Sequence, residues 1–201
     1  MPPGSTVSST TPLLTTPRAL RTRARILETA LGLFERDGYE STTVARVAAA
    51  AGVTEMTFYR HFPTKDSVLV SDPYDPLIAD VVAAQPPDLP TVERVRRGML
   101  AALATIEPVE ETTARRRVAL VAPVPTLRGA VTAATAATER AIADRLVADG
   151  VPRLDAVVAA AACLGACTAA LLSLPDDDRS LGDVISHALG LIGAGHERAH
   201  S

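Results

Sequence analysis

The segment from Glu55 to Phe62 places side chains that can read nucleic-acid bases on one face of a short predicted helix. Phe58 and Phe62 lie four residues apart, so both are expected to point to the core. The side chains left to face outward are Glu55, Met56, Thr57, Tyr59, Arg60 and His61. Threonine and methionine contact thymine methyl groups, a carboxylate accepts from cytosine N4, and tyrosine and histidine donate to phosphates. The pattern therefore predicts contact with DNA.

This helix needs a second element to hold it in place. Thr42 or Thr43 is expected to cap a short helix that ends before a tight turn at Gly52. Thr54 then caps the helix that carries the outward side chains. Two short helices joined by a glycine-containing turn predict a helix-turn-helix, whose second helix enters the DNA major groove.

A longer helix is expected before this pair. Thr16 and Pro17 supply an N-cap and a first-position proline, and Gly38 supplies a left-handed stop. Apolar residues recur between them at helical spacing: Ile26, Leu27, Ala30, Leu33 and Phe34. A proline at position 63 ends the third helix. We therefore expect a three-helix domain over residues 16–63, preceded by a disordered tail over residues 1–15.

The run from Arg23 to Leu69, about 50 of the 201 residues, resembles the TetR family of transcription regulators nearly end to end. The matching features are Ile26-Leu27, Leu33-Phe34, Gly38-Tyr39, Thr42-Thr43-Val44, Val47-Ala48, Ala51-Gly52-Val53, Thr57-Phe58-Tyr59, His61-Phe62 and Lys65. The resemblance implies a homodimer that binds a palindromic operator in double-stranded DNA.

The resemblance also implies roles for single residues. Glu55, Met56 and Tyr59 match the positions next to the bases. The implied phosphate contacts are Thr43, Thr57, His61 and Lys65. Relatives vary widely at the position of Met56, so the operator sequence does not carry over.

Several of these positions also have a structural interpretation. Thr54 serves as a cap, Glu55 favours the positive end of the helix dipole, and Tyr39 is expected to pack against the core. The arginines at positions 18, 21, 23 and 25 form either a solvated helix start or a basic arm on the DNA backbone or minor groove.

Positive charge is concentrated in the N-terminal part of the chain. Residues 1–70 carry seven arginines and one lysine against six acids, a net charge of +2, while residues 71–201 carry twelve arginines against seventeen acids, a net charge of −5. The overall net charge of −3 does not exclude DNA binding, because the distribution of charge matters more than the total.

The remaining residues are predicted to be helical throughout, with prolines and glycines at the breaks. The expected helices span 74–84, 91–106, 111–121, 125–148, 152–174 and 179–194. The predicted fold class is therefore all-α. A three-helix helix-turn-helix domain is followed by a larger helical ligand-binding and dimerisation domain over 64–195 and a tail over 196–201.

An uncharged stretch, residues 156–174, is long enough to cross a bilayer. Its many alanines, and flanks without basic or aromatic anchors, favour a helix buried among other helices.

Small residues allow close approach, so 152–174 and 179–194 are expected to form a four-helix interface with a second copy. Cys163 and Cys167 are expected to be buried and reduced. We expect a cytoplasmic protein without a membrane span.

The stretch 75–191 also resembles the C-terminal domain of the mycofactocin-system regulators. The matching features are Asp75-Pro76-Leu77, Arg115-Arg116-Arg117 with Val118 and Leu120, and Val124-Pro125-Thr126-Leu127-Arg128. That group is associated with acyl-coenzyme A effectors. The resemblance implies a small apolar effector, with acyl-coenzyme A as first candidate, in a cavity between 91–106, 111–148 and 152–174. Arg115, Arg116 and Arg117 form either an anion-binding lip or a solvated face paired with Glu110 and Glu111.

Catalytic and metal-binding patterns do not emerge. The sequence offers no nucleophile–base arrangement and no supported metal-ligand spacing, so we expect no enzymatic activity, no metal and no cofactor. Two functions stay open: a repressor released by a small apolar effector, or a DNA-bound regulator whose C-terminal helices engage a protein partner. A closed apolar cavity would favour the first function, and an exposed apolar groove the second.

Overall fold

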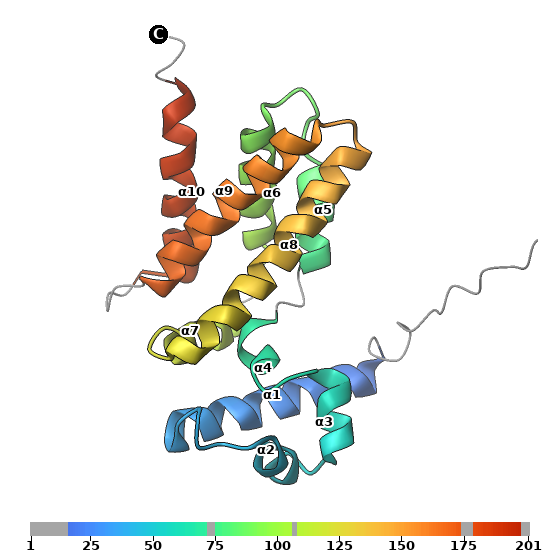
Figure 1. The fold of residues 1–201 in the computed structure, drawn as a ribbon, viewed down its shortest axis with the longest axis vertical. Coiled ribbons are helices and arrows are strands. Elements are labelled where there is room, and N and C mark those ends of the chain that lie inside the picture. Colours follow the sequence, from blue (N-terminus) through green and yellow to red (C-terminus); the bar gives the residue numbers. More distant parts are fainter. Residues whose placement is uncertain (1–15, 72–74, 106–107, 174–178, 198–201) are drawn as a thin grey trace, which may run out of the picture. The chain divides into compact units, whose positions relative to one another are not determined.

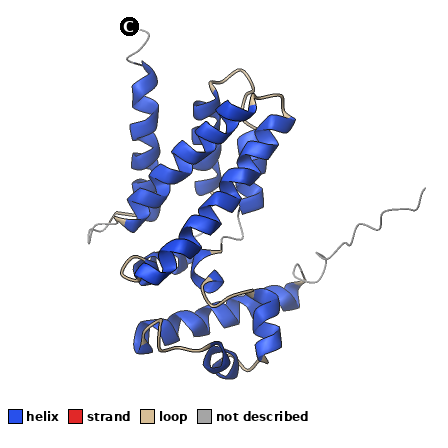
Figure 2. Cartoon of the chain, in the orientation of Figure 1, coloured by secondary structure: helices blue, strands red, loops and turns tan. Residues whose placement is uncertain are grey.

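The computed structural model describes residues 16–71, 75–105, 108–173 and 179–197. Every regular element in those ranges is a helix (Figures 1 and 2), which confirms the all-α prediction. The chain divides into two compact units between Val68 and Leu69, a few residues beyond the expected boundary after residue 63. The tail expected over 1–15 lies outside the described residues.

From residue 16 onward, the first unit contains three helices, α1 (Pro17–Asp37), α2 (Val44–Ala50) and α3 (Glu55–His61), and leads into the short helix α4 (Ser67–Val70). The predicted ends of α1 are confirmed. Thr16 Oγ1 accepts a hydrogen bond from the backbone N–H of Ala19 at 3.2 Å, and Gly38, with φ +85°, ends the helix. The almost fully buried core residues include Ile26, Leu31, Phe34, Val47, Phe58, Phe62 and Val68.

Two threonine caps and one glycine define the helix-turn-helix. Thr43 Oγ1 accepts from the backbone N–H of Arg46 at 3.2 Å and so caps α2, whereas Thr42 is buried. Gly52 adopts φ +65° in the turn, a conformation that costs glycine little. Thr54 Oγ1 accepts from the backbone N–H of Thr57 at 3.1 Å and so caps α3. The sequence prediction of this motif is confirmed element by element.

The described residues of the second unit form six α-helices. They are α5 (Asp75–Ala83), α6 (Thr91–Leu103), α7 (Pro108–Val121), α8 (Arg128–Ala148), α9 (Arg153–Leu172) and α10 (Leu181–Glu197), with a short 3₁₀ turn (η1, Pro125–Leu127) before α8. These bounds lie within three residues of the predicted ones. Within this unit α8 and α9 run side by side (Figure 1) and are joined through Gly150, which adopts φ +92°.

One face of α9 packs into this core and the opposite face does not. Ala156, Ala159, Ala160, Cys163 and Cys167 are buried, and α9 contacts α6, α8 and α10. Leu154 and Val158 are more than half exposed. Within one copy of the chain, the expectation of a helix buried among other helices therefore holds for one face of α9. An alanine-rich helix presents apolar atoms on every face but covers only the side that its neighbours reach.

Helices α5 and α6 approach closely at Gly98. A Cβ atom added there would lie 2.5 Å from the Cα of Val82, closer than any real Cβ contact. We expect Gly98→Ala to lower the free energy of unfolding of the second unit by about 1–3 kcal/mol, as for other overpacked sites.

Chemical denaturation followed by circular dichroism measures this effect. Gly129→Ala in α8 is the matched control, because a Cβ there meets nothing within 4 Å and alanine favours helix. Equal stability of the two variants would contradict the close approach.

Candidate DNA-reading surface and ligand pocket

The outward face of α3 carries most of the side chains that the sequence placed there. Glu55, Met56, Tyr59 and Arg60 are exposed, and Met56 retains 79% of its accessible surface. The Met56 side chain is therefore available for contact with a partner outside the chain. Phe58 and Phe62 are buried with ring centroids 5.9 Å apart, as predicted.

The two threonines at the start of α3 act together. Thr54 and Thr57 hydroxyls lie 3.0 Å apart, and Thr54 also caps the helix. Thr57 is half-buried, so it faces outward only in part. Thr43, which caps α2, is exposed. The hydroxyls of Thr43 and Thr54 therefore order the N-terminal ends of the two short helices, and the Thr57 hydroxyl contacts that of Thr54.

His61 does not face outward, so that expectation is wrong. Its side chain is 5% exposed. Burial, and then the positive charges of Arg60 and Arg23, lower the pKa of His61 below its ordinary value of 6.5. A buried neutral imidazole is a poor phosphate ligand, and exposed Arg60 is the better candidate for that contact.

The lowered pKa of His61 predicts a pH dependence of stability. The unfolded chain binds the proton more readily than the folded one, so the contribution is complete above pH 6.5 and is lost as pH falls below it. We expect the free energy of unfolding of the wild type to fall more between pH 7 and 5 than that of His61→Gln. Denaturant titrations at both pH values test this, and parallel pH slopes would contradict it.

Arg23 of α1 holds the end of α3, which the sequence did not indicate. Its Nη1 donates to the backbone oxygen of His61 at 2.5 Å, and its guanidinium carbon lies 4.1 Å from the ring centroid of Phe62. Burial lowers the pKa of Arg23. The end of α3 has no glycine cap, because Phe62 continues in an extended conformation, so Arg23 supplies the donor that the last turn lacks.

The other three arginines of the expected basic arm lie differently. Those at positions 18, 21 and 25 are exposed. Arg23 is therefore no longer a candidate for the basic arm, because its side chain contacts α3. The three exposed arginines are still candidates for contact with DNA.

Lys65 lies between α3 and α4 in the sequence, and its side chain hydrogen-bonds to the loop between α1 and α2. Its Nζ donates to the backbone oxygens of Tyr39 at 3.0 Å and Thr42 at 3.2 Å. The same nitrogen lies 4.0 Å from the ring centroid of Tyr39. The Tyr39 hydroxyl donates to Asp66. Tyr39 is buried, as expected for a packing residue, and its burial and the Asp66 carboxylate raise its pKa.

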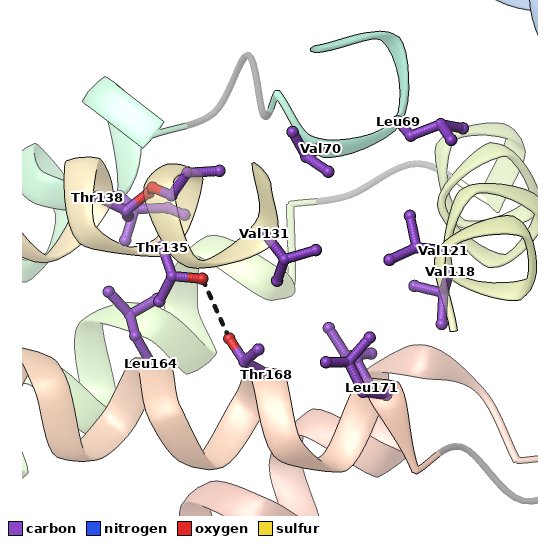
Figure 3. Close-up of a pocket in the computed structure, with 13 residues that line it drawn as sticks. Leu69, Val70, Val118, Val121, Val131, Thr135, Thr138, Leu164, Thr168 and Leu171 are labelled. Atoms are coloured by element: carbon purple, nitrogen blue, oxygen red, sulfur yellow. Dashed lines mark hydrogen bonds between the residues drawn. The ribbon is translucent and has the colours of Figure 1, made fainter. Parts of the chain in front are cut away.

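In the second unit, a pocket of about 220 Å³ lies between α7, α8 and α9 and the end of α4 (Figure 3). We call it the central pocket. Its lining residues are Leu69, Val70, Ile78, Val118, Val121, Val131, Ala134, Thr135, Thr138, Leu164, Thr168, Leu171 and Leu172. None of them is charged, so the pocket suits an apolar occupant.

Two further pockets share walls with the central one. The α7–α10 pocket, about 280 Å³, shares Val118 and Leu171 with it and also contacts Glu111 and Arg117. The outer pocket, about 540 Å³, shares Thr135 and Thr168 and extends to exposed residues of α8 and α9. The three pockets together follow α7 and α9. Helix α6 contributes only Leu103, so the predicted cavity wall at 91–106 is largely wrong.

The arginine run in the second half of α7, Arg115 to Arg117, is predicted to form either an anion-binding lip or a solvated face. Arg117 Nε donates to the backbone oxygen of Leu69 at 2.8 Å, and its Nη2 to that of Ser71 at 2.5 Å. Arg115 and Arg116 do not line the three pockets. Glu111 accepts from the backbone N–H of Leu181 at 2.8 Å and so caps α10. These polar groups fasten α7 to its neighbours.

Three other features of the described residues bear on the predictions. No group of three or more histidine, cysteine or acidic side chains that could hold a metal occurs within the described ranges. Cys163 and Cys167 are free and buried, and burial raises their thiol pKa values to about 11 and about 12. Helix α9 is long and apolar enough to cross a membrane, and 28% of its most apolar window is buried within the chain. A core helix passes the same test.

Two family models match the chain. The model described as bacterial regulatory proteins of the tetR family covers residues 26–71. The model described as the MftR C-terminal domain covers residues 89–197, more than half of the chain. The chain therefore belongs to the tetR family of bacterial regulatory proteins, with a C-terminal domain of the MftR type.

Curated relatives match over short stretches of the chain. The regulator TcmR of Streptomyces glaucescens is 45% identical over 51 residues, which cover 25% of this chain and 23% of TcmR. AcrR of Shigella flexneri is 44% identical over 50 residues, which cover 25% and 23% of the two chains. The chain thus spans about a quarter of the length of these relatives.

Solved structures are similar over most of the chain. The SmeT–triclosan complex has a TM-score of 0.56 at 21% identity and covers 87% of this chain and 91% of SmeT. A TetR-family regulator from Streptomyces coelicolor A3 has a TM-score of 0.56 at 19% identity, covering 90% and 97%. At such identities the likeness establishes the fold, with a helix-turn-helix unit followed by a helical unit.

Proposed function

We propose that this protein is a homodimeric transcription repressor that binds a palindromic operator and is released by a small apolar effector. The observation that carries the proposal is the outward face of α3, where Glu55, Met56, Tyr59 and Arg60 are exposed on a helix fixed by its caps and core. Methionine and glutamate offer contacts to bases, and tyrosine and arginine contacts to phosphates. Family membership supports the same function.

The dimer is supported by an apolar face on the last two helices. The large exposed apolar side chains there are Leu154, Val157, Val158, Leu172 and Leu191. A two-fold pairing of this face would cover them with the same face of a second copy. If the face stays exposed in a stable dimer, it becomes a docking site for a protein partner, the alternative function.

The effector is supported by the three neighbouring pockets, which share lining residues and are lined mainly by apolar side chains. Acyl-coenzyme A remains the first candidate because the C-terminal half is of the MftR type, a group that the sequence resemblance associates with such effectors. Release requires that the effector bind the DNA-free form more tightly than the DNA-bound form.

The direct experiment is selection of bound fragments from the source genome, followed by footprinting and titration. We expect two symmetric half-sites about one helical turn (~34–36 Å) or more apart. Acyl-coenzyme A of increasing chain length is then titrated into the complex. A footprint with a single asymmetric half-site would exclude a two-fold symmetric dimer on the operator. If no acyl chain length releases the protein from the operator, acyl-coenzyme A is excluded as the effector class.

Met56 is expected to determine base preference. Met56→Ala should change discrimination at one base pair of each half-site by about 1–3 kcal/mol. Arg60→Gln should weaken binding to all sequences and reduce the salt slope by about one unit. Operator libraries titrated at several salt concentrations separate the two effects. If Met56→Ala discriminates among all operators as the wild type does, Met56 does not read bases.

A further inference from the structure

Three threonine hydroxyls provide the side-chain polar groups of the central pocket. Thr135 and Thr138 come from α8 and Thr168 comes from α9, and Figure 3 shows Thr135 and Thr168 pointing toward each other. Thr138 is buried and its hydroxyl donates within its own helix, to the backbone oxygen of Ala134, whereas Thr135 and Thr168 are half-buried. Thr135 and Thr168 are therefore the pair that faces a ligand across the pocket.

The contact between Thr135 and Thr168 is long. Their hydroxyl oxygens are 3.4 Å apart, whereas hydroxyl hydrogen bonds are usually about 2.7–2.8 Å long. Each hydroxyl has one donor and two acceptor positions, so this single long contact leaves capacity for a further partner. A ligand oxygen beside the pair would form shorter hydrogen bonds to both.

The absence of charge in the lining of the central pocket determines which kind of ligand oxygen can bind there. No lining residue of the central pocket is charged, and a carboxylate placed there would lose water without gaining a cation. In the neighbouring α7–α10 pocket, Arg117 already donates to two backbone oxygens and Glu111 caps α10. A neutral hydroxyl or carbonyl oxygen needs only hydroxyl partners.

We propose that the central pocket selects a neutral, largely apolar group with one hydrogen-bonding oxygen, an alcohol, ketone or ester-type carbonyl, held between Thr135 and Thr168. An acyl-coenzyme A would place only its acyl chain and thioester carbonyl there, with its charged part outside the pocket. This inference rests on the proposed function in placing the effector in this pocket. It adds that the two hydroxyls, rather than the arginines of α7, determine which polar group is accepted.

The test uses the full chain and three eight-carbon probes, 1-octanol, 2-octanone and octanoate, with binding measured by calorimetry. We expect 1-octanol and 2-octanone to bind at least about ten-fold more tightly than octanoate. Comparable binding of octanoate, or no binding of 1-octanol at its solubility limit, would overturn the proposal.

Substitutions separate hydrogen bonding from shape. Thr168→Val and Thr135→Val keep the side-chain shape and lose the hydroxyl, and each should weaken 1-octanol binding by roughly three- to ten-fold. Thr168→Ser keeps the hydroxyl and should retain most of the affinity. Thr132→Val, at an exposed position that lines only the outer pocket, is the control. Wild-type affinity in both valine variants, or a loss in Thr168→Ser as large as in Thr168→Val, would overturn the role of the hydroxyls.

Operator binding without ligand is measured in parallel. If the wild type binds no operator, the proposed function fails while the ligand preference is still measured directly. If it binds operator but shows no preference among the probes, only the ligand inference fails.

Discussion

A charged side chain at Ala162 is expected to convert the proposed dimer into monomers and to abolish tight operator binding. Ala162 is exposed on α9, on the same side as Leu154 and Val158. In a two-fold interface Ala162→Glu buries one carboxylate from each copy without a partner. At about 2 kcal/mol or more for each, the dimer dissociation constant should rise by at least about 1,000-fold.

Sedimentation equilibrium and operator titration measure these two effects. Ala162 is a better site for the charge than Ala166, which is half-buried, so that a charge there would also damage the fold. Ala101→Glu, at an exposed alanine of α6, is the matched control and should leave the assembly unchanged. A dimer that survives Ala162→Glu with its affinity intact would place the interface elsewhere.

Removal of the Arg23 side chain is expected to loosen α3 and to reduce operator affinity strongly. Arg23→Ala loses a charge-assisted hydrogen bond to the His61 carbonyl, worth about 1.5–3 kcal/mol, and a contact with the Phe62 ring worth about 0.5–2 kcal/mol. We expect the first unit to lose about 2–4 kcal/mol of stability.

Tyrosine fluorescence follows this unfolding, because Tyr39 and Tyr59 lie in the first unit and the chain has no tryptophan. Arg25→Ala removes an exposed arginine of the same helix and serves as the control. It should affect salt-dependent DNA affinity but not unfolding. Equal unfolding effects of the two variants would show that Arg23 does not hold α3.

Local signals made the first unit predictable. The caps at Thr16 and Thr54 and the stop at Gly38 each act within four residues, and the i, i+4 spacing of Phe58 and Phe62 fixes the inward face of α3. Because these interactions are encoded in neighbouring positions, their sequence pattern carries over directly to the structure.

Contacts between distant residues were not predictable. Arg23 and His61 are 38 residues apart, and Arg117 contacts backbone oxygens 46 and 48 residues away. A guanidinium can satisfy a carbonyl anywhere within its reach, so no spacing in the sequence marks these pairs. The sequence also did not show which face of α9 is buried and which is exposed, because nearly uniform alanine gives the helix no amphipathic pattern.

The reactivity of the Lys65 amine can be used to measure opening of the loop between α1 and α2. It is the only lysine in the chain, and its amine is engaged with the Tyr39 and Thr42 backbone oxygens. An acylating reagent such as an activated ester therefore has one lysine to modify, and it requires the neutral, disengaged amine. The rate of labelling at this single position would report how often the loop opens, and operator DNA bound over it would slow that rate.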